Sequence, residues 1–189
     1  MPVRIVTPKR FEDARGWFSE SYNAARFASL EIDASFCQDN LSFSAATLTL
    51  RGIHFQRAPH SQAKLIRCVK GCIFDVAVDL RHASPTYGRS VSTILSAQGG
   101  EQLFVPAGFG HAYLTLVPDC EVAYKVDSYY APDAEGGIAW NDPELAIAWP
   151  LDGGQPLLSA KDAALPPLAD SAFDFPYDGR PLTPLHPED

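Results

Sequence analysis

Short runs of alternating apolar and polar residues recur along most of the chain, and turn-forming residues separate them. In the clearest run, residues 73–80, four apolar side chains alternate with Asp75, Ala77 and Asp79. A period of two places alternate side chains on opposite faces of an extended strand. Gly71 before this run and the Ser-Pro-Thr-Tyr-Gly segment at 84–88 after it are typical of turns. The pattern predicts a β-strand at 73–80.

The same pattern extends over most of the chain. Further strands are predicted at 47–56, 63–70, 90–96, 101–105, 111–117 and 121–127. One short helix is predicted from Asn23 to Leu30, with Asn23 as its N-cap. Alternation fades after Ile147 and prolines become frequent, which predicts a tail that wraps around the strands. We therefore expect an all-β jelly-roll barrel or sandwich, formed as one domain over residues 1–189.

Composition narrows the functional classes. The net charge of −8 argues against a nucleic-acid-binding protein, which needs a cationic face, but a few basic residues in one pocket can still bind a phosphate. The sequence contains no apolar stretch long enough to span a membrane and no signal-like N-terminal run. The four cysteines are expected to be reduced thiols, mostly buried, in the cytoplasm.

Several segments contain side chains that could do chemistry. Arg51 and His54 would point to opposite faces of a regular strand, but a bulge at Gly52 could turn both toward one pocket. Taken alone, a strand histidine such as His54 is more often a hydrogen-bonded structural residue than a catalyst. Lys64 shares a strand face with apolar neighbours, which suggests a buried ammonium; an edge-strand lysine that prevents aggregation is the alternative.

Three more segments leave similar alternatives open. His111 follows a glycine-rich turn and would lie either at the mouth of a pocket or in solvent. Tyr124 shares a face with apolar residues, as a structural tyrosine or a proton donor. Asp162 could orient a histidine, or it could form a helix-capping pair with Ser159.

Familiar catalytic motifs do not explain these residues. The sequence has no GxSxG elbow, no phosphate-binding loop with Lys-Ser/Thr and no GxGxxG motif after a strand. A metal site in a small β-barrel would use clustered histidines and carboxylates, such as a His-x-His pair. Here Gln56 stands where the second histidine would be, and the next candidate, Lys64, is a cation. We therefore expect neither a bound metal nor another cofactor.

Taken together, these segments closely resemble the dTDP-4-dehydrorhamnose 3,5-epimerase family, a metal-free branch of the cupin-like jelly rolls. The matching blocks lie in family order over nearly all of residues 11–168. The most specific are LRGIHFQ (50–56), QAKLIRCVKG (62–71), DVAVDLRHASPTYG (75–88), VPAGFGHAYLTL (105–116) and YKVDSYYAP (124–132). The other blocks are FEDARGWFSESYN (11–23), FCQDNLSFS (36–44), EGGIAWNDPELAIAWP (135–150) and LSAKDAALPPL (158–168).

The resemblance implies a role for each candidate. His54 matches the general base, Asp162 its orienting carboxylate, Tyr124 the general acid and Lys64 the cation near the developing enolate. Tyr130 matches the tyrosine that stacks on thymine. The positions that match substrate contacts are Arg15, Glu20, Gln38, Asp39, Asn40, Arg51, His111, Glu135 and Lys161. The family forms homodimers in which an N-terminal segment contributes to the neighbouring subunit's site.

The implied substrate is a dTDP-linked 4-keto-6-deoxy sugar, whose C3 and C5 hydrogens are acidified by the C4 ketone. Inversion at both carbons would convert dTDP-4-dehydro-6-deoxy-D-glucose to dTDP-4-dehydro-L-rhamnose, with no redox step. One departure concerns the loop histidine, which the family usually follows with Gly-Phe and this chain follows with Ala112-Tyr113. By the resemblance, the tyrosine adds a hydroxyl near the sugar and bears on the sugar specificity. The alternatives are an epimerase that inverts only C3, a metal-dependent cupin oxygenase and a non-catalytic sugar-nucleotide binder.

Overall fold

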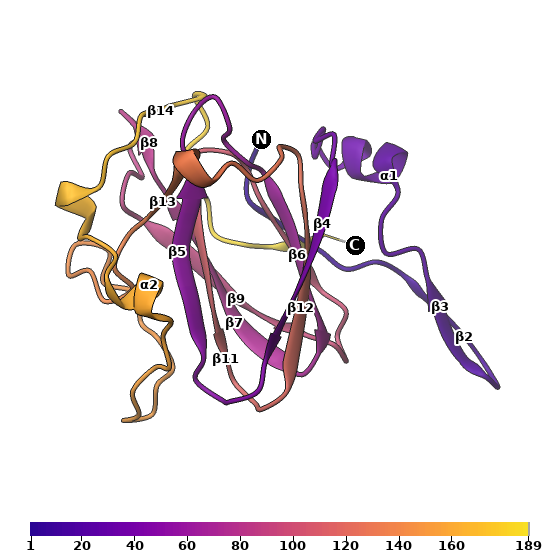
Figure 1. Cartoon of the computed structure of the whole chain (residues 1–189). Helices are drawn as coiled ribbons and strands as arrows, with labels where there is room; N and C mark the ends of the chain where they lie inside the picture. Colours follow the sequence, from indigo (N-terminus) through magenta and orange to yellow (C-terminus); the bar gives the residue numbers. More distant parts are fainter. Residues whose placement is uncertain (189) are drawn as a thin grey trace.

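Two β-sheets face each other and form the body of the protein (Figure 1). The computed structural model describes residues 1–188. The six-stranded sheet has the order β15 (Pro187–Glu188), β1 (Arg4–Val6), β10 (Gln102–Val105), β6 (Lys64–Lys70), β12 (Cys120–Val126) and β4 (Gln38–Ser44). The five-stranded sheet has the order β13 (Glu135–Gly137), β5 (Leu50–Gln56), β11 (Phe109–Thr115), β7 (Cys72–Asp79) and β9 (Ser90–Ser96). Apart from the parallel β1–β15 pair, neighbouring strands in both sheets are antiparallel. This sandwich confirms the predicted all-β jelly-roll class.

The hydrophobic core lies between the two sheets. Ile66 of β6 and Val122 of β12 belong to the same buried cluster as Ile73 and Ala77 of β7. Ile66, Ile73 and Ala77 are 0% exposed. Burying each isoleucine side chain contributes about 1.5–3 kcal/mol, before the entropy of ordering the chain is subtracted. The alternation along the strands therefore creates the interface that holds the sheets together.

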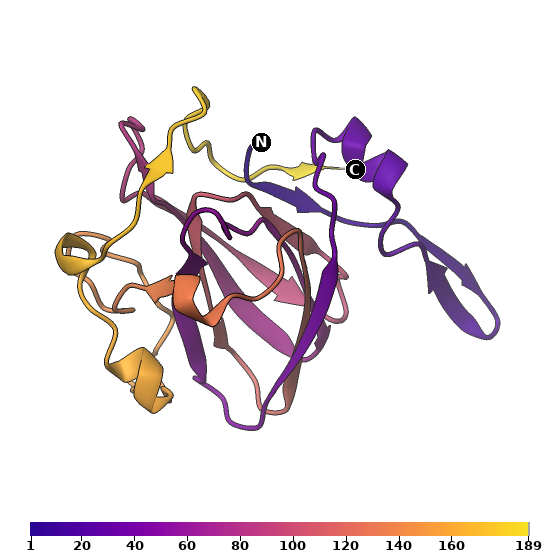
Figure 2. The same cartoon turned by 45° about the horizontal axis from the view of Figure 1, so that its top comes forward.

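Strand β7 is buried on both faces. Val76, Val78 and Leu80 pack on the outer side of the five-stranded sheet against apolar residues of the C-terminal segment, including Phe175. Asp75 lies on the opposite face and is also 0% exposed. The predicted wrapping tail thus covers a sheet face that would otherwise present a row of apolar side chains to water (Figure 2).

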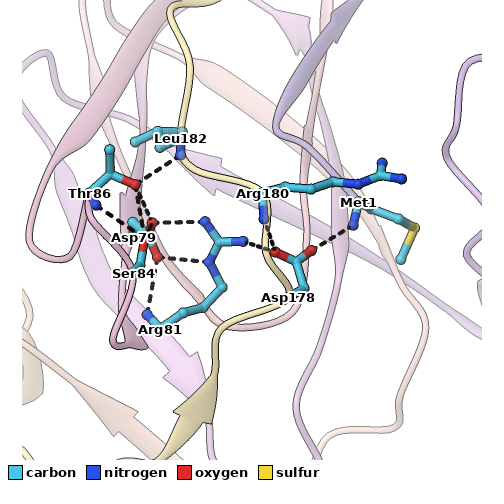
Figure 3. Close-up of polar contacts among 8 residues, drawn as sticks. All are labelled: Met1, Asp79, Arg81, Ser84, Thr86, Asp178, Arg180 and Leu182. Atoms are coloured by element: carbon cyan, nitrogen blue, oxygen red, sulfur yellow. Dashed lines mark hydrogen bonds and ion pairs between the residues drawn. The ribbon is translucent and has the colours of Figure 1, made fainter.

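A network of charged side chains fixes the tail to the barrel (Figure 3). Asp79 accepts two hydrogen bonds from Arg81, both 2.8 Å long, and others from the hydroxyls of Ser84 and Thr86. Arg81, on the short strand β8 (Arg81–His82), also donates to Asp178 of the tail at 2.6 Å. Burial alone raises the pKa of Asp79, but these hydrogen bonds outweigh it and hold the pKa below its ordinary value.

The rest of the network ties both chain ends together. Asp178 accepts a further bond from the Met1 ammonium at 3.1 Å, and the Leu182 N–H donates to the Thr86 hydroxyl at 2.8 Å. The tail also pairs with the barrel through β14 (Phe175–Pro176), which runs parallel to β8. The network therefore closes the tail over the sheet at several points.

Strand β4 was not among the predicted strands, because its pattern is inverted. Gln38, Asn40 and Ser42 are partly buried, whereas Leu41 and Phe43 are 68% and 53% exposed. A rule that places apolar side chains inside and polar side chains outside does not identify such a segment as a strand. The polar inner face instead lines a pocket described below.

An arm projects away from the sandwich (Figure 2). It consists of the hairpin β2 (Arg10–Asp13) and β3 (Gly16–Ser19), followed by helix α1 (Ala24–Ser29). The hairpin exposes Phe11, Trp17 and Phe18 by 53%, 58% and 68%. The helix confirms the prediction, since Asn23 caps it by accepting from the Arg26 N–H at 3.2 Å.

The remaining elements are short. They are α2 (Ala160–Ala163) and two 3-10 turns, Pro132–Ala134 and Leu168–Asp170. The strand predicted at 47–56 begins only at Leu50, because Leu48 adopts a positive φ of 59° that an extended strand cannot contain. Within residues 1–188, no helix is long and apolar enough to cross a membrane.

Candidate active site

A bulge in β5 brings Arg51 and His54 to the same pocket. His54 is paired with His111 of β11 and Arg51 with Tyr113, so three steps on β5 match two on β11. Gly52 absorbs the extra residue with a φ of +121°, a conformation that strongly favours glycine. A Cβ at this position would lie 2.5 Å from the Ala112 Cβ. The predicted bulge is therefore present, and it depends on glycine.

His54 and Asp162 form a hydrogen-bonded pair. The His54 Nε2 lies 2.6 Å from the Asp162 Oδ1, and Asp162 is only 5% exposed. Burial raises the pKa of Asp162, but the hydrogen bond from His54 outweighs it and holds the pKa below its ordinary value. An ionised carboxylate can only accept, so Nε2 carries a proton, and in the neutral ring Nδ1 then has the free lone pair. This pair has the form of a general base with its orienting group.

The segment 159–162 makes both of the contacts that the sequence analysis considered. The Ser159 hydroxyl accepts from the Asp162 N–H at 3.0 Å and caps α2. The same helical turn presents the Asp162 carboxylate to His54. The cap therefore fixes the orienting carboxylate as well as starting the helix.

Lys64 is an interior lysine and not an edge lysine. Its strand β6 lies between β10 and β12, and Lys64 is paired with Val105 on one side and Val126 on the other. Burial lowers the pKa of Lys64 to about 8, although the nearby Glu135 and Asp75 carboxylates favour its charged form. The ammonium is therefore a cation that loses its proton readily.

Tyr124 lies on β12, in the sheet opposite His54. Its ring centroid is 6.0 Å from the Lys64 Nζ. Burial raises the pKa of the Tyr124 phenol, while the positive charge of Arg51 partly offsets the shift. The phenol is thus protonated at neutral pH and can donate a proton into the pocket.

Asp75, which the sequence analysis did not assign to the site, is the partner of His111. The His111 Nε2 lies 2.9 Å from the Asp75 Oδ1, and the two residues are 7% and 0% exposed. The alternation along 73–80 placed Asp75 opposite the apolar face, so nothing in the sequence indicated that this carboxylate is buried beside a histidine. A second His–Asp pair therefore stands beside the first, since His54 and His111 are neighbours across β5 and β11.

The rim of the pocket is polar. The Tyr130 hydroxyl donates to Glu135 at 3.0 Å, and Lys161 forms an ion pair with the same carboxylate. Gln38 and Asn40, joined by a 2.8 Å hydrogen bond, extend this rim along β4. The Tyr130 ring itself is 54% exposed, so its face is free to receive a planar ligand.

These side chains line one continuous hollow between the sheets. The main cavity has a volume of about 380 Å³, and an adjoining one of about 120 Å³ shares five of its residues. The predicted site residues that line them are His54, Lys64, Tyr124, Asp162, Arg51, His111, Tyr130, Glu135, Lys161, Gln38 and Asn40. Ser42, Ser159 and Tyr113, the residue that departs from the family pattern, also line the main cavity.

Three predicted substrate contacts lie outside this hollow. Arg15 is at the tip of the arm, where its exposed side chain pairs with Asp13. Glu20 follows β3 and is exposed as well. Asp39 points to the outer face of β4 and pairs with Lys125 at 2.8 Å, since consecutive strand residues face opposite ways.

Comparison with known proteins identifies the relatives of this chain. The family profile described as dTDP-4-dehydrorhamnose 3,5-epimerase matches residues 2–170. The dTDP-4-dehydrorhamnose 3,5-epimerase of Salmonella typhimurium is 49% identical over 172 residues, which cover 90% of this chain and 92% of the relative.

Solved structures agree with the family profile. The epimerase of Bacillus anthracis, solved with TDP and PPi bound, has a TM-score of 0.85 and 49% identity, covering 87% of this chain and 93% of its own. A dTDP-6-deoxy-D-glucose-3,5-epimerase from Legionella pneumophila, in complex with dTDP-4-keto-L-rhamnose, has a TM-score of 0.84 and 44% identity over 89% and 88% of the two chains. The profile over most of the chain and relatives of nearly half identity with the same fold show that the chain belongs to the dTDP-4-dehydrorhamnose 3,5-epimerase family of carbohydrate epimerases.

Proposed function

We propose that the pocket inverts C3 and C5 of dTDP-4-dehydro-6-deoxy-D-glucose and so forms dTDP-4-dehydro-L-rhamnose. The observation that carries this proposal is the placement of His54 and Tyr124 on opposite sheets. A base and an acid that face each other across a cavity can remove a proton from one side of a carbon and return one to the other side.

His54 is the base in this mechanism. Its Nδ1 removes the hydrogen from a carbon next to the C4 ketone, and the electron pair of that C–H bond moves into an enolate. The ring then carries a positive charge, which the Asp162 carboxylate, 2.6 Å from Nε2, stabilises. The short buried contact keeps the ring in one orientation through both inversions.

Lys64 and Tyr124 complete each inversion. The Lys64 ammonium stabilises the negative oxygen of the enolate. Tyr124 then transfers its phenolic proton to the opposite face of the carbon, and exchange with solvent restores both the phenol and the neutral imidazole. The ketone is already present in the substrate, so the electrons balance without an oxidant.

The rim residues are proposed to bind the nucleotide. Arg51 supplies a guanidinium that can hold the diphosphate through paired N–H groups, and His111, fixed by Asp75, faces the same cavity. The exposed ring of Tyr130 offers a stacking surface for thymine. Gln38, Asn40, Glu135 and Lys161 supply further polar contacts around the sugar nucleotide.

We also propose that the enzyme is a homodimer whose arms reach the partner's site. The arm exposes Phe11, Trp17 and Phe18, and the outer face of β4 exposes Leu41 and Phe43. Apolar side chains gathered on a projecting hairpin and an edge strand favour association with a second copy. Arg15 and Glu20 lie on or next to this arm, so exchange of arms would carry them to the partner's pocket.

A cytoplasmic location is the final part of the proposal. All four cysteines are free, and Cys68 and Cys120 are buried. Burial raises the pKa of Cys68 to about 12, so this thiol stays protonated. Free thiols are typical of a reducing compartment.

Incubation with the 4-keto sugar nucleotide in D₂O tests the function. We expect deuterium at both C3 and C5 of the recovered sugar, measured by NMR. Deuterium confined to C3 would replace the proposal with a C3-only epimerase. Binding without exchange at either carbon would indicate a non-catalytic sugar-nucleotide binder.

A further inference from the structure

Tyr113 places a third phenol in the catalytic cavity, beside those of Tyr124 and Tyr130. It lies on β11, two residues beyond His111, and its side chain is 4% exposed. It lines the same cavity as His54, Lys64 and Tyr124. The proposed mechanism gives it no task, although its hydroxyl is a polar group inside an otherwise apolar cluster.

The hydroxyl of Tyr113 is held by Ser42. The two oxygens are 2.8 Å apart, and the Ser42 Oγ also lies 3.3 Å from the Val122 carbonyl oxygen. Ser42 has a single proton, so when that proton points to the Val122 carbonyl, Tyr113 donates its own proton to Ser42. Ser44 makes a further side-chain hydrogen bond with this phenol, and the Tyr113 oxygen, which has two lone pairs, can still accept one more on its cavity side.

The surroundings keep this phenol neutral and fixed in place. Burial raises the pKa of Tyr113, while the hydrogen bond with Ser42 and the charge of Arg51 oppose the shift only in part. The Arg51 Nε donates to Ser44 at 3.3 Å, and its Nη2 donates to the Phe43 carbonyl at 2.9 Å. The guanidinium is therefore anchored along β4, beside the phenol.

We propose that Tyr113 is a specificity-determining residue, whose phenol oxygen accepts a hydrogen bond from a hydroxyl of the bound sugar. Ser42 orients the phenol, and the contact holds the sugar ring between the two sheets. A site that offers a buried acceptor rejects a ligand lacking the matching hydroxyl, because the acceptor is then left without a partner. The inference rests on the proposed sugar-nucleotide function, and it concerns the sugar and not the nucleotide.

The test compares Tyr113→Phe with the wild type in the binding of dTDP and of dTDP-glucose, by calorimetry. This substitution removes only the hydroxyl. We expect the affinity for dTDP to stay within twofold and the affinity for dTDP-glucose to fall about three- to tenfold, the value of one hydrogen bond. Tyr87→Phe, which removes a phenol hydroxyl outside the cavity, serves as the matched control and should leave both affinities unchanged.

Two results would overturn the proposal. One is a Tyr113→Phe variant that binds both ligands like the wild type. The other is a variant that loses affinity for both equally, because the hydroxyl would then support the fold and not the sugar. Since binding is measured with unreactive ligands, an enzyme that fails to exchange C3 and C5 hydrogens would refute the proposed function without deciding the role of Tyr113.

Discussion

Lys64 should set the alkaline limit of catalysis. Its pKa of about 8 means that half of the free enzyme carries a neutral amine at that pH. Only the ammonium can stabilise the enolate oxygen. The charged fraction falls from about nine-tenths at pH 7 to about one-tenth at pH 9, so kcat/KM, which reports the free enzyme, should drop roughly tenfold over this interval.

The lowered pKa of Lys64 also predicts that its charge destabilises the folded protein at neutral pH. The pKa of Lys64 falls from 10.5 in the unfolded chain to about 8 in the folded protein. This shift means that folding with a charged Lys64 costs about 3 kcal/mol in the free energy of unfolding. Because the residue is partly exposed, this figure is an upper value. The penalty is fully present below pH 8 and is relieved as the pH rises toward 10.5. Lys64→Met should therefore be more stable than the wild type at pH 7 while losing most of its activity.

Two variants and two assays test this reasoning. Deuterium exchange is measured from pH 6 to 10 with the wild type, Lys64→Met and Lys70→Met, and thermal unfolding is measured at pH 7. Lys70 is an exposed lysine on the same strand, so its replacement should change neither the pH profile nor the Tm. A wild-type kcat/KM that stays level up to pH 9.5, or an alkaline limb near pH 8 that persists in Lys64→Met, would refute the assignment.

Three further substitutions test other parts of the structure. Asp162→Asn keeps the shape of the side chain but removes the charge behind His54, so kcat should fall about 10²- to 10⁴-fold with little change in dTDP affinity; an almost fully active variant would exclude the pair from catalysis. Gly52→Ala would force a Cβ to within 2.5 Å of the Ala112 Cβ at a φ of +121°, and should cost about 3 kcal/mol or more in the free energy of unfolding together with activity. Its control, Gly153→Ala, has a positive φ of +81° but no neighbouring atom within 4 Å, and should cost about 1 kcal/mol without affecting turnover; equal losses in the two variants would contradict the packing argument. Arg81→Met leaves Asp79 as an unpaired buried charge and should lower the free energy of unfolding by about 3–5 kcal/mol, measured by denaturant titration at pH 7; the loss should shrink as the pH falls through the depressed pKa of Asp79, and a pH-independent loss would point to packing alone.

Local patterns along the chain predicted much of the fold. The alternation in 73–80 placed the apolar and acidic side chains of β7 on opposite faces, as they are found. Asn23 predicted the start of α1, and the fading alternation after Ile147 predicted the tail. Such features depend on the geometry of a few consecutive residues, so the sequence alone determined them.

Local patterns predicted less of the active site than of the fold, because the side chains of the site come from segments that are far apart in the sequence. Asp162 lies 108 residues beyond His54, and no spacing rule relates them. The family resemblance identified both, but not the role of Asp75 behind His111. Strand β4 escaped prediction because its inner face is polar and its outer face apolar, the reverse of an ordinary strand.

Sequence by itself therefore determined most strands of the two sheets, the helix cap, the tail and, through its motifs, the family. Only the tertiary structure decided that β6 is an interior strand, which makes Lys64 a partly buried cation with a lowered pKa. It also decided that the bulge at Gly52 points the Arg51 and His54 side chains into one cavity, and that Ser42 holds the Tyr113 hydroxyl there. The physical reason is that periodicity reports the direction of a side chain relative to its own strand, whereas a site depends on which strands become neighbours and on where their register shifts.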